Sequence, residues 1–122
     1  MIECFPMELL GNHILSIDQF ERPDIEKIFS TSDLLLPYAK RERITRVLKG
    51  AILSNMFFEP STRTRISFGS AFNILGGEVR ETTGIEATSL AKGESLYDTS
   101  RVLSGYSDII VMRHHEAGSV NE

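Results

Sequence analysis

The chain has 122 residues and a mass of 13.7 kDa, enough for one domain with a hydrophobic core and too little for two ordinary domains. Its net charge of -4 argues against a general surface for nucleic acid or anionic membrane. A single cysteine, Cys4, excludes an internal disulfide and fits a reducing cytosol, and we expect neither a signal peptide nor a membrane span.

The first predicted helix follows a short lead-in, His13 to Phe20, in which Ser16 is a candidate N-cap. Pro23 suits a first helical position. Apolar residues then recur at roughly helical spacing: Ile25, Ile28, Phe29 and Leu35. Leu36-Pro37 should end this helix, because a residue that precedes proline is biased away from the helical region.

A buried strand and a second helix form the centre of the predicted fold. AILSNMFF, residues 51–58, is short, largely apolar and bounded by turn residues, which favours a mostly buried strand. Residues 61–75 are predicted to be helical and to end at Gly76-Gly77. The expected apolar face of this helix consists of Phe68, Ala71, Phe72 and Leu75.

The last third of the chain repeats this alternation. EVRETT (78–83) is a strand candidate, and residues 84–94 have no period and are typical of an exposed loop. A third helix is expected from the spacing of Leu96, Thr99, Leu103 and Tyr106. SDIIVMR (107–113) then predicts another buried strand. The alternation indicates an α/β fold, a parallel sheet flanked by helices.

The segment from Ser61 to Arg65 concentrates three hydroxyls and two arginines where a strand gives way to a helix. In a parallel sheet, ligands collect at the carboxyl ends of the strands, and a helix N-terminus there offers unpaired amides and a positive dipole end. A single serine or threonine before a helix is a cap about four times more often than a ligand. Two arginines in a first turn oppose the helix dipole, however, and a bound anion removes that penalty. The cluster therefore predicts a phosphate-binding turn.

Three charged residues elsewhere are expected near the same edge of the sheet. Lys92 alone would be a solvated surface lysine, which is the usual case in about 80% of instances. Arg113 is more informative, since it follows IIVM and should emerge at the ligand edge. Glu59 could repel an anion, and we expect it to pair either with Arg65 or with an arginine outside this chain.

Two other clusters favour ordinary structural interpretations. His114 and His115 are expected to point in different directions, and with His13 and Cys4 they form no recognisable zinc spacing, so no metal is predicted. The basic stretch from Lys40 to Lys49 contains no aromatic residue on which bases could stack, and a solvated helix face explains it.

Four motifs in order, FFEPSTRTRISF, LGGEV, SLAKGESLYDT and DIIVMRH, resemble the transcarbamoylase family from about His13 to the end of the chain. Within it, Ser89-x-x-Lys92 and Met112-Arg113-His114 are more similar to the aspartate branch than to the ornithine branch. One departure is His115, where the aspartate branch commonly has proline.

The resemblance implies a cytoplasmic transferase of pyrimidine biosynthesis that moves a carbamoyl group from carbamoyl phosphate to the amine of L-aspartate, without metal or organic cofactor. Substrate-binding residues implied by the resemblance are Ser61, Thr62, Arg63, Thr64, Ser89, Lys92 and Arg113. Of these, Thr64 and Arg113 are implied to reach the carbamoyl oxygen and so to be catalytic. Ser89 and Lys92 are implied to enter a neighbouring subunit's site, which makes the catalytic unit a homotrimer. Glu59 matches a position that helps to hold the two domains of the enzyme closed.

Family chains are considerably longer, so we expect residues 1–122 to be a partial carbamoyl-phosphate-binding domain, with the aspartate-binding domain absent from this chain. These residues alone are expected to be inactive. Two alternatives stay open at this point: an ornithine transcarbamoylase, or a non-catalytic anion-binding or oligomerisation module.

Overall fold

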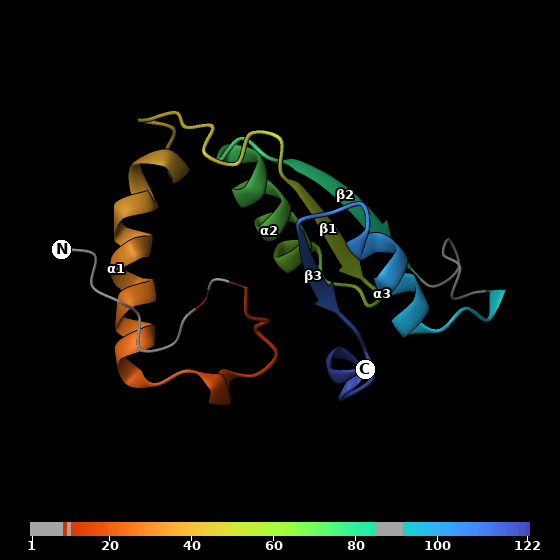
Figure 1. The fold of residues 1–122 in the computed structure, drawn as a ribbon. Coiled ribbons are helices and arrows are strands. Elements are labelled where there is room, and N and C mark those ends of the chain that lie inside the picture. The colour runs from red at the N-terminus through yellow and green to blue at the C-terminus, as the bar shows by residue number, and fades with distance from the viewer. Residues whose placement is uncertain (1–8, 10, 85–91) are drawn as a thin grey trace. The chain divides into compact units, whose positions relative to one another are not determined.

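The computed structural model describes residue 9, residues 11–84 and residues 92–122 (Figure 1). The chain divides into two compact units, Met1–Glu42 and Arg43–Glu122. The second unit holds a three-stranded parallel sheet with helices, so the predicted α/β class is confirmed. None of the described helices is both long enough and apolar enough to cross a membrane.

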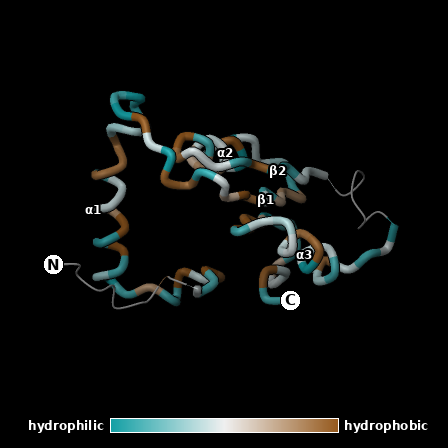
Figure 2. The backbone as a smooth tube through the Cα atoms, turned by 45° about the horizontal axis from the view of Figure 1, so that its top comes forward, coloured by the Kyte–Doolittle hydropathy of each residue, from teal (hydrophilic) through white to brown (hydrophobic). Residues whose placement is uncertain are grey.

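The first unit consists of a short 3-10 helix, η1 (Ile17–Gln19), and the long helix α1 (Arg22–Ala39). Ser16 caps η1 as predicted, since its hydroxyl accepts from the Asp18 amide and the Gln19 side chain accepts from the Ser16 amide. Hydrophobic stretches recur between hydrophilic ones along α1 (Figure 2).

The predicted end of α1 at Leu36-Pro37 is wrong. The helix continues through Pro37 to Ala39, and the Lys40 amide still bonds to the Leu36 carbonyl at 2.9 Å. Proline lacks only its own amide donor, and here that loss falls in the last turn, where few further helical bonds follow.

The second unit is built around β1 (Ile52–Phe57), the central strand of the sheet. It pairs in parallel with β2 (Glu78–Thr83) on one side and with β3 (Ile109–Arg113) on the other. Figure 1 shows α2 (Thr62–Ile74) and α3 (Leu96–Ser104) on opposite sides of this sheet. A last 3-10 helix, η3, spans Ser119–Asn121.

The core lies along β1 and beneath α2. Its buried apolar side chains are Leu53, Met56, Phe57, Phe58 and Phe72. The prediction of a buried strand at 51–58 is therefore confirmed. The same prediction for the last strand is wrong: Ile109 in β3 is 49% exposed and the rest of the strand is at best half-buried, because β3 is an edge strand among the described residues.

The C-terminus of α2 explains how the chain enters β2. The Gly77 amide bonds to the Phe72 carbonyl and the Gly76 amide to the Asn73 carbonyl, the pattern of a Schellman cap with Gly76 left-handed at φ +97°. The expected apolar face of α2 is only partly correct. Phe72 is buried but Phe68 is 48% exposed, because the helix turns Gly69 rather than Phe68 toward the sheet.

The parallel strands β1 and β3 end at the same edge of the sheet. The chain leaves β1 for α2 on one side of the sheet, and α3 on the other side leads back to β3, which lies next to β1. Adjacent strands whose helices lie on opposite faces leave a crevice at their carboxyl ends, where α/β proteins place ligands.

Candidate anion-binding site

A hollow of about 250 Å³ lies at the carboxyl edge of β1 and β2. It is lined by Phe57, Phe58, Glu59, Pro60, Ser61, Thr62, Arg65, Thr83 and Gly84. Its floor is the buried end of β1, and one wall is the first turn of α2. This is the edge at which the sequence predicts a ligand.

The first turn of α2 begins without a side-chain cap. Ser61 occupies the N-cap position, but its hydroxyl makes no cap hydrogen bond, and this turn contains no acidic residue. The orphan amides and the positive end of the helix dipole are therefore left to another partner. By contrast, Ser95 caps α3 by accepting a hydrogen bond from the Asp98 amide at 3.0 Å. The ordinary capping interpretation thus fits Ser95 and does not fit Ser61.

The two arginines of this turn have different surroundings. Arg65 is part-buried, and its Nη1 lies 3.4 Å from Glu81 Oε2 on β2. Arg63 is exposed and forms no ion pair within the described part of the chain. Arg63 therefore contributes positive charge that no neighbouring carboxylate cancels.

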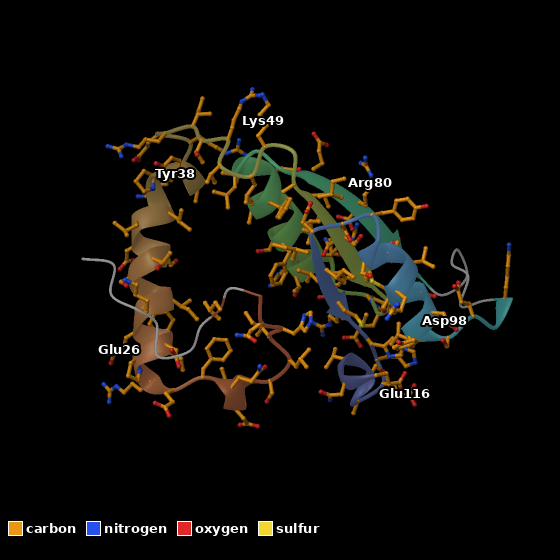
Figure 3. The ribbon with its side chains drawn as sticks, in the orientation of Figure 1. Glu26, Tyr38, Lys49, Arg80, Asp98 and Glu116 are labelled. Carbon is orange, nitrogen blue, oxygen red and sulfur yellow. The ribbon has the colours of Figure 1, made fainter. Side chains whose placement is uncertain are left out.

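A polar network behind the turn was not anticipated from the sequence. Asn55, fully buried in β1, donates through Nδ2 to the Arg65 carbonyl at 2.9 Å and to Glu81 Oε1 at 3.2 Å. A signal for it was available, since an asparagine inside a largely apolar strand needs hydrogen-bond partners. Glu81 could be identified as a partner only from the register of the sheet, in which Asn55 and Glu81 are direct neighbours. The adjacent Arg80 is exposed on β2 (Figure 3).

Arg113 emerges at the predicted place, as the last residue of β3 and in register with Phe57. Its guanidinium pairs with the carboxylate of Glu59. Arg65, one of the two partners expected for Glu59, pairs instead with Glu81, and pairing of Glu59 with an arginine outside the chain stays a prediction. The pair with Arg113 has a simple cause, because β3 pairs with β1 and brings a residue 54 positions away beside Glu59.

Of the other predicted site residues, those that the structure describes do not line the hollow. Thr64 is half-buried in the first turn of α2 but, like Arg63, does not line the hollow. Lys92 is exposed and does not line it either. Ser89 lies outside the described residues. The structure thus brings Ser61 and Thr62 into the hollow, with Glu59 linking it to Arg113.

The two histidines do not point in different directions, contrary to expectation. Their rings stack at a centroid distance of 4.4 Å. His114 Nδ1 accepts from the Glu116 amide at 3.1 Å and lies 2.9 Å from the Ser119 hydroxyl. The His114 ring also packs edge-on against Phe58 at 5.6 Å. These contacts fold the segment after β3 against the end of β1, so His114 has a structural role there.

Residues 12–122 match the family described as aspartate/ornithine carbamoyltransferase, carbamoyl-P binding domain. The chain is 69% identical over 116 residues to the aspartate carbamoyltransferase catalytic subunit of Saccharophagus degradans, covering 95% of this chain and 34% of that relative. It is 70% identical over 116 residues to the corresponding subunit of Cellvibrio japonicus, with the same coverage. The chain therefore spans about a third of the length of these relatives.

Solved structures agree with the sequence comparison. The aspartate transcarbamoylase of Trypanosoma cruzi, in complex with carbamoyl aspartate and phosphate, superposes with a TM-score of 0.83 at 38% identity, covering 91% of this chain and 36% of that one. The catalytic subunit of the M. jannaschii enzyme superposes with a TM-score of 0.83 at 43% identity, covering 89% and 36%. With the family match over residues 12–122, these likenesses establish that the chain belongs to the aspartate/ornithine carbamoyltransferase family and carries its carbamoyl-phosphate-binding domain.

Proposed function

We propose that this chain supplies the carbamoyl-phosphate site of an aspartate carbamoyltransferase. The observation that carries the proposal is the first turn of α2, whose amides have no side-chain cap and whose Arg63 has no carboxylate partner in the described structure. Such a turn can hold a phosphate dianion through backbone amides, hydroxyls and one guanidinium. The aspartate enzymes among the relatives, and the T. cruzi enzyme in complex with carbamoyl phosphate and aspartate, support the choice of substrates.

In this proposal the phosphate lies against Ser61, Thr62, Arg63 and Thr64, and the carbamoyl oxygen lies between Thr64 and Arg113. Aspartate's amine attacks the carbonyl carbon to form the C–N bond of a tetrahedral intermediate, the nitrogen loses a proton, and phosphate leaves as the C–O bond breaks. Negative charge grows on the carbonyl oxygen and on the departing phosphate. Donors already aimed at these positions each stabilise the transition state by about 3 to 4 kcal/mol, by analogy with oxyanion holes.

Arg113 must share its charge between the substrate and Glu59. The ion pair in this structure keeps the guanidinium at the edge of the hollow, where its remaining N–H groups are free to turn toward a carbamoyl oxygen. Glu59 lines the hollow, and without Arg113 its carboxylate would repel a phosphate. The pair therefore lowers the cost of placing an acid beside an anion site.

The proposal extends to a homotrimer in which Ser89 and Lys92 complete the site of a neighbouring subunit. Lys92 is exposed and does not line the hollow of its own chain, as this arrangement requires. A cytoplasmic location and a role in pyrimidine biosynthesis complete the proposed function. The single cysteine fits a reducing compartment.

Turnover is best tested in a full-length catalytic chain. The matching 116 residues of the Saccharophagus degradans subunit can be replaced by the corresponding residues of this chain, which are 69% identical. We call this protein the exchange chain. Formation of carbamoyl aspartate from carbamoyl phosphate and aspartate is measured, with ornithine as the competing acceptor. The intact mass of the native polypeptide, compared with 13.7 kDa, tells whether an aspartate-binding domain accompanies these residues naturally.

Replacement of Arg63 by alanine provides the decisive comparison. We expect Arg63→Ala to lower the turnover of the exchange chain by at least about 100-fold, because the guanidinium stabilises the departing phosphate. Arg80→Ala is the matched control, since Arg80 is exposed on β2 and does not line the hollow. Near-normal turnover in Arg63→Ala would overturn the phosphate assignment. Binding of phosphate by a folded exchange chain that never turns over would favour a non-catalytic anion-binding module instead.

A further inference from the structure

Three residues join the first turn of α2 to the sheet behind it, and we call them the clamp. They are Asn55 on β1, Arg65 on α2 and Glu81 on β2. Three separate groups of Arg65 are held. Its amide bonds to the Ser61 carbonyl at 3.0 Å, its carbonyl accepts from Asn55, and its guanidinium pairs with Glu81.

Glu81 joins the other members of the clamp. Its Oε1 accepts from Asn55 Nδ2 at 3.2 Å, while its Oε2 lies 3.4 Å from Arg65 Nη1. Gly69 of α2 packs beside this carboxylate, since a Cβ there would lie in ordinary van der Waals contact, 3.4 Å from Glu81 Oε1 and 3.8 Å from Asn55 Nδ2. One carboxylate thus fixes both the central strand and the helix turn that leaves it.

The clamp also separates the roles of the two arginines. Arg65 is paired with Glu81 and so adds little net charge to the hollow that it lines. Arg63 stands on the same turn without such a partner in the described part of the chain. If the Glu81 carboxylate were absent, the Arg65 guanidinium would lose this partner, and the turn would lose one of its links to the sheet.

We propose that Glu81 is a positioning residue for phosphate, acting through Arg65 and Asn55 on the turn from Ser61 to Thr64. The proposal rests on the proposed function, since it concerns the same site. Glu81 does not line the hollow, so it has no direct contact with the anion to lose. Its effect should therefore fall on the affinity for phosphate, through the orientation of amides and hydroxyls that it does not itself touch.

The test uses Glu81→Gln in the exchange chain. Glutamine keeps the shape of the side chain and an oxygen that can accept from Asn55, and it removes the charge that holds Arg65. We expect the KM for carbamoyl phosphate and the Ki of inorganic phosphate to rise together by about 10-fold, equivalent to about 1.4 kcal/mol. The KM for aspartate and the kcat should change by less than about threefold.

Two comparisons separate positioning from general destabilisation. Glu78→Gln is the matched control, because Glu78 begins the same strand, is exposed, and forms no ion pair in the described structure. It should leave both constants unchanged. Arg65→Met breaks the pair from the other side, and the double variant with Glu81→Gln should be no worse than the weaker-binding single variant, since both changes remove one interaction.

The outcomes distinguish this proposal from the proposed function. If Arg63→Ala abolishes turnover while Glu81→Gln leaves the KM and the Ki unchanged, the positioning role is wrong and the phosphate site stands. If Glu81→Gln only lowers the thermal midpoint, with phosphate affinity at the level of the Glu78→Gln control, Glu81 is structural and the proposal is again overturned. If Arg63→Ala retains turnover, the site itself is wrong.

Discussion

Arg63 and Arg65 have the same side chain and stand two positions apart, yet they belong to different parts of the molecule. The part-buried guanidinium of Arg65 lies against a carboxylate of β2, whereas that of Arg63 is exposed at the free end of the helix dipole. Two arginines at the N-terminus of a helix are unfavourable together. The ion pair with Glu81 cancels the charge of Arg65, and a bound anion would cancel the charge of Arg63.

Gly76, which follows the C-terminus of α2, and Gly50, which precedes β1, permit a test of steric crowding. Both are left-handed, at φ +97° and +88°. A Cβ at Gly76 would lie 2.7 Å from the Arg46 Cα, whereas one at Gly50 would meet nothing within 4 Å. Gly50→Ala should cost about 1 kcal/mol of unfolding free energy from backbone strain alone. Gly76→Ala should cost at least about 2 kcal/mol more, because backbone atoms must also move.

Urea unfolding of both variants measures this difference. The comparison has an internal control, since the two substitutions share the same change in side chain and the same region of backbone conformation. Equal losses in the two variants would mean that Arg46 moves away freely, and the close packing of the α2 C-terminus against the preceding segment would then be discounted.

The helices α2 and α3 both have a serine at the N-cap position, but the two serines form different contacts. Ser95 caps α3, and its hydroxyl also lies 2.7 Å from the Asp98 carboxylate. Ser61 makes no such bond. Ser95→Ala should therefore cost about 1 kcal/mol of unfolding free energy, whereas Ser61→Ala should cost only a few tenths.

For the affinity for phosphate we expect the reverse order, with the larger effect in Ser61→Ala. Ser61→Ala in the exchange chain should weaken inhibition by inorganic phosphate, while Ser95→Ala should leave it unchanged, because only Ser61 lines the hollow. Unfolding free energies and phosphate inhibition constants, measured on the same two variants, check both halves. A loss of stability in Ser61→Ala as large as that in Ser95→Ala would show that Ser61 is an ordinary cap.

Local patterns predicted the elements near the site well. The strand at 78–83 has the predicted bounds, and the predictions for β1 and α2 each extend one residue too far at both ends. These segments have strong breakers at their ends, Pro60 and Gly76-Gly77, which act through the local backbone. The bounds of α1 and the burial of β3 were missed because they depend on context: a proline in a last turn is tolerated, and an edge strand lacks a second neighbour.

The same distinction between local features and context holds for the residues of the candidate site. The turn from Ser61 to Thr64 and the place of Arg113 could be predicted, because both follow from where parallel strands end. The partners of the charged residues could not. Glu59 with Arg113, and Arg65 with Glu81, are joined across strands, and only the sheet order and register decide which carboxylate faces which guanidinium.

The chain as a whole is acidic, and its proposed substrate carries phosphate. A net charge of -4 gives no general attraction for anions, so binding must come from short-range contacts at one turn. The pairing of Arg65 with Glu81 and of Arg113 with Glu59 leaves that turn with few competing charges nearby. Selectivity for a small phosphate compound is then a local property of the α2 N-terminus.

The choice of amino-acid substrate should, by the same reasoning, belong to the remainder of a catalytic chain. The hollow of about 250 Å³ is suited to a small anion, and the chain spans about a third of the length of its relatives. We therefore expect the exchange chain to prefer aspartate over ornithine as strongly as the unmodified Saccharophagus degradans subunit does, within about twofold. The ratio of kcat/KM for the two acceptors, measured in both proteins, checks this. A shift of that ratio toward ornithine would place part of the acceptor site within these residues, and Arg113 would then be the first side chain to vary, since it is exposed at the carboxyl end of β3.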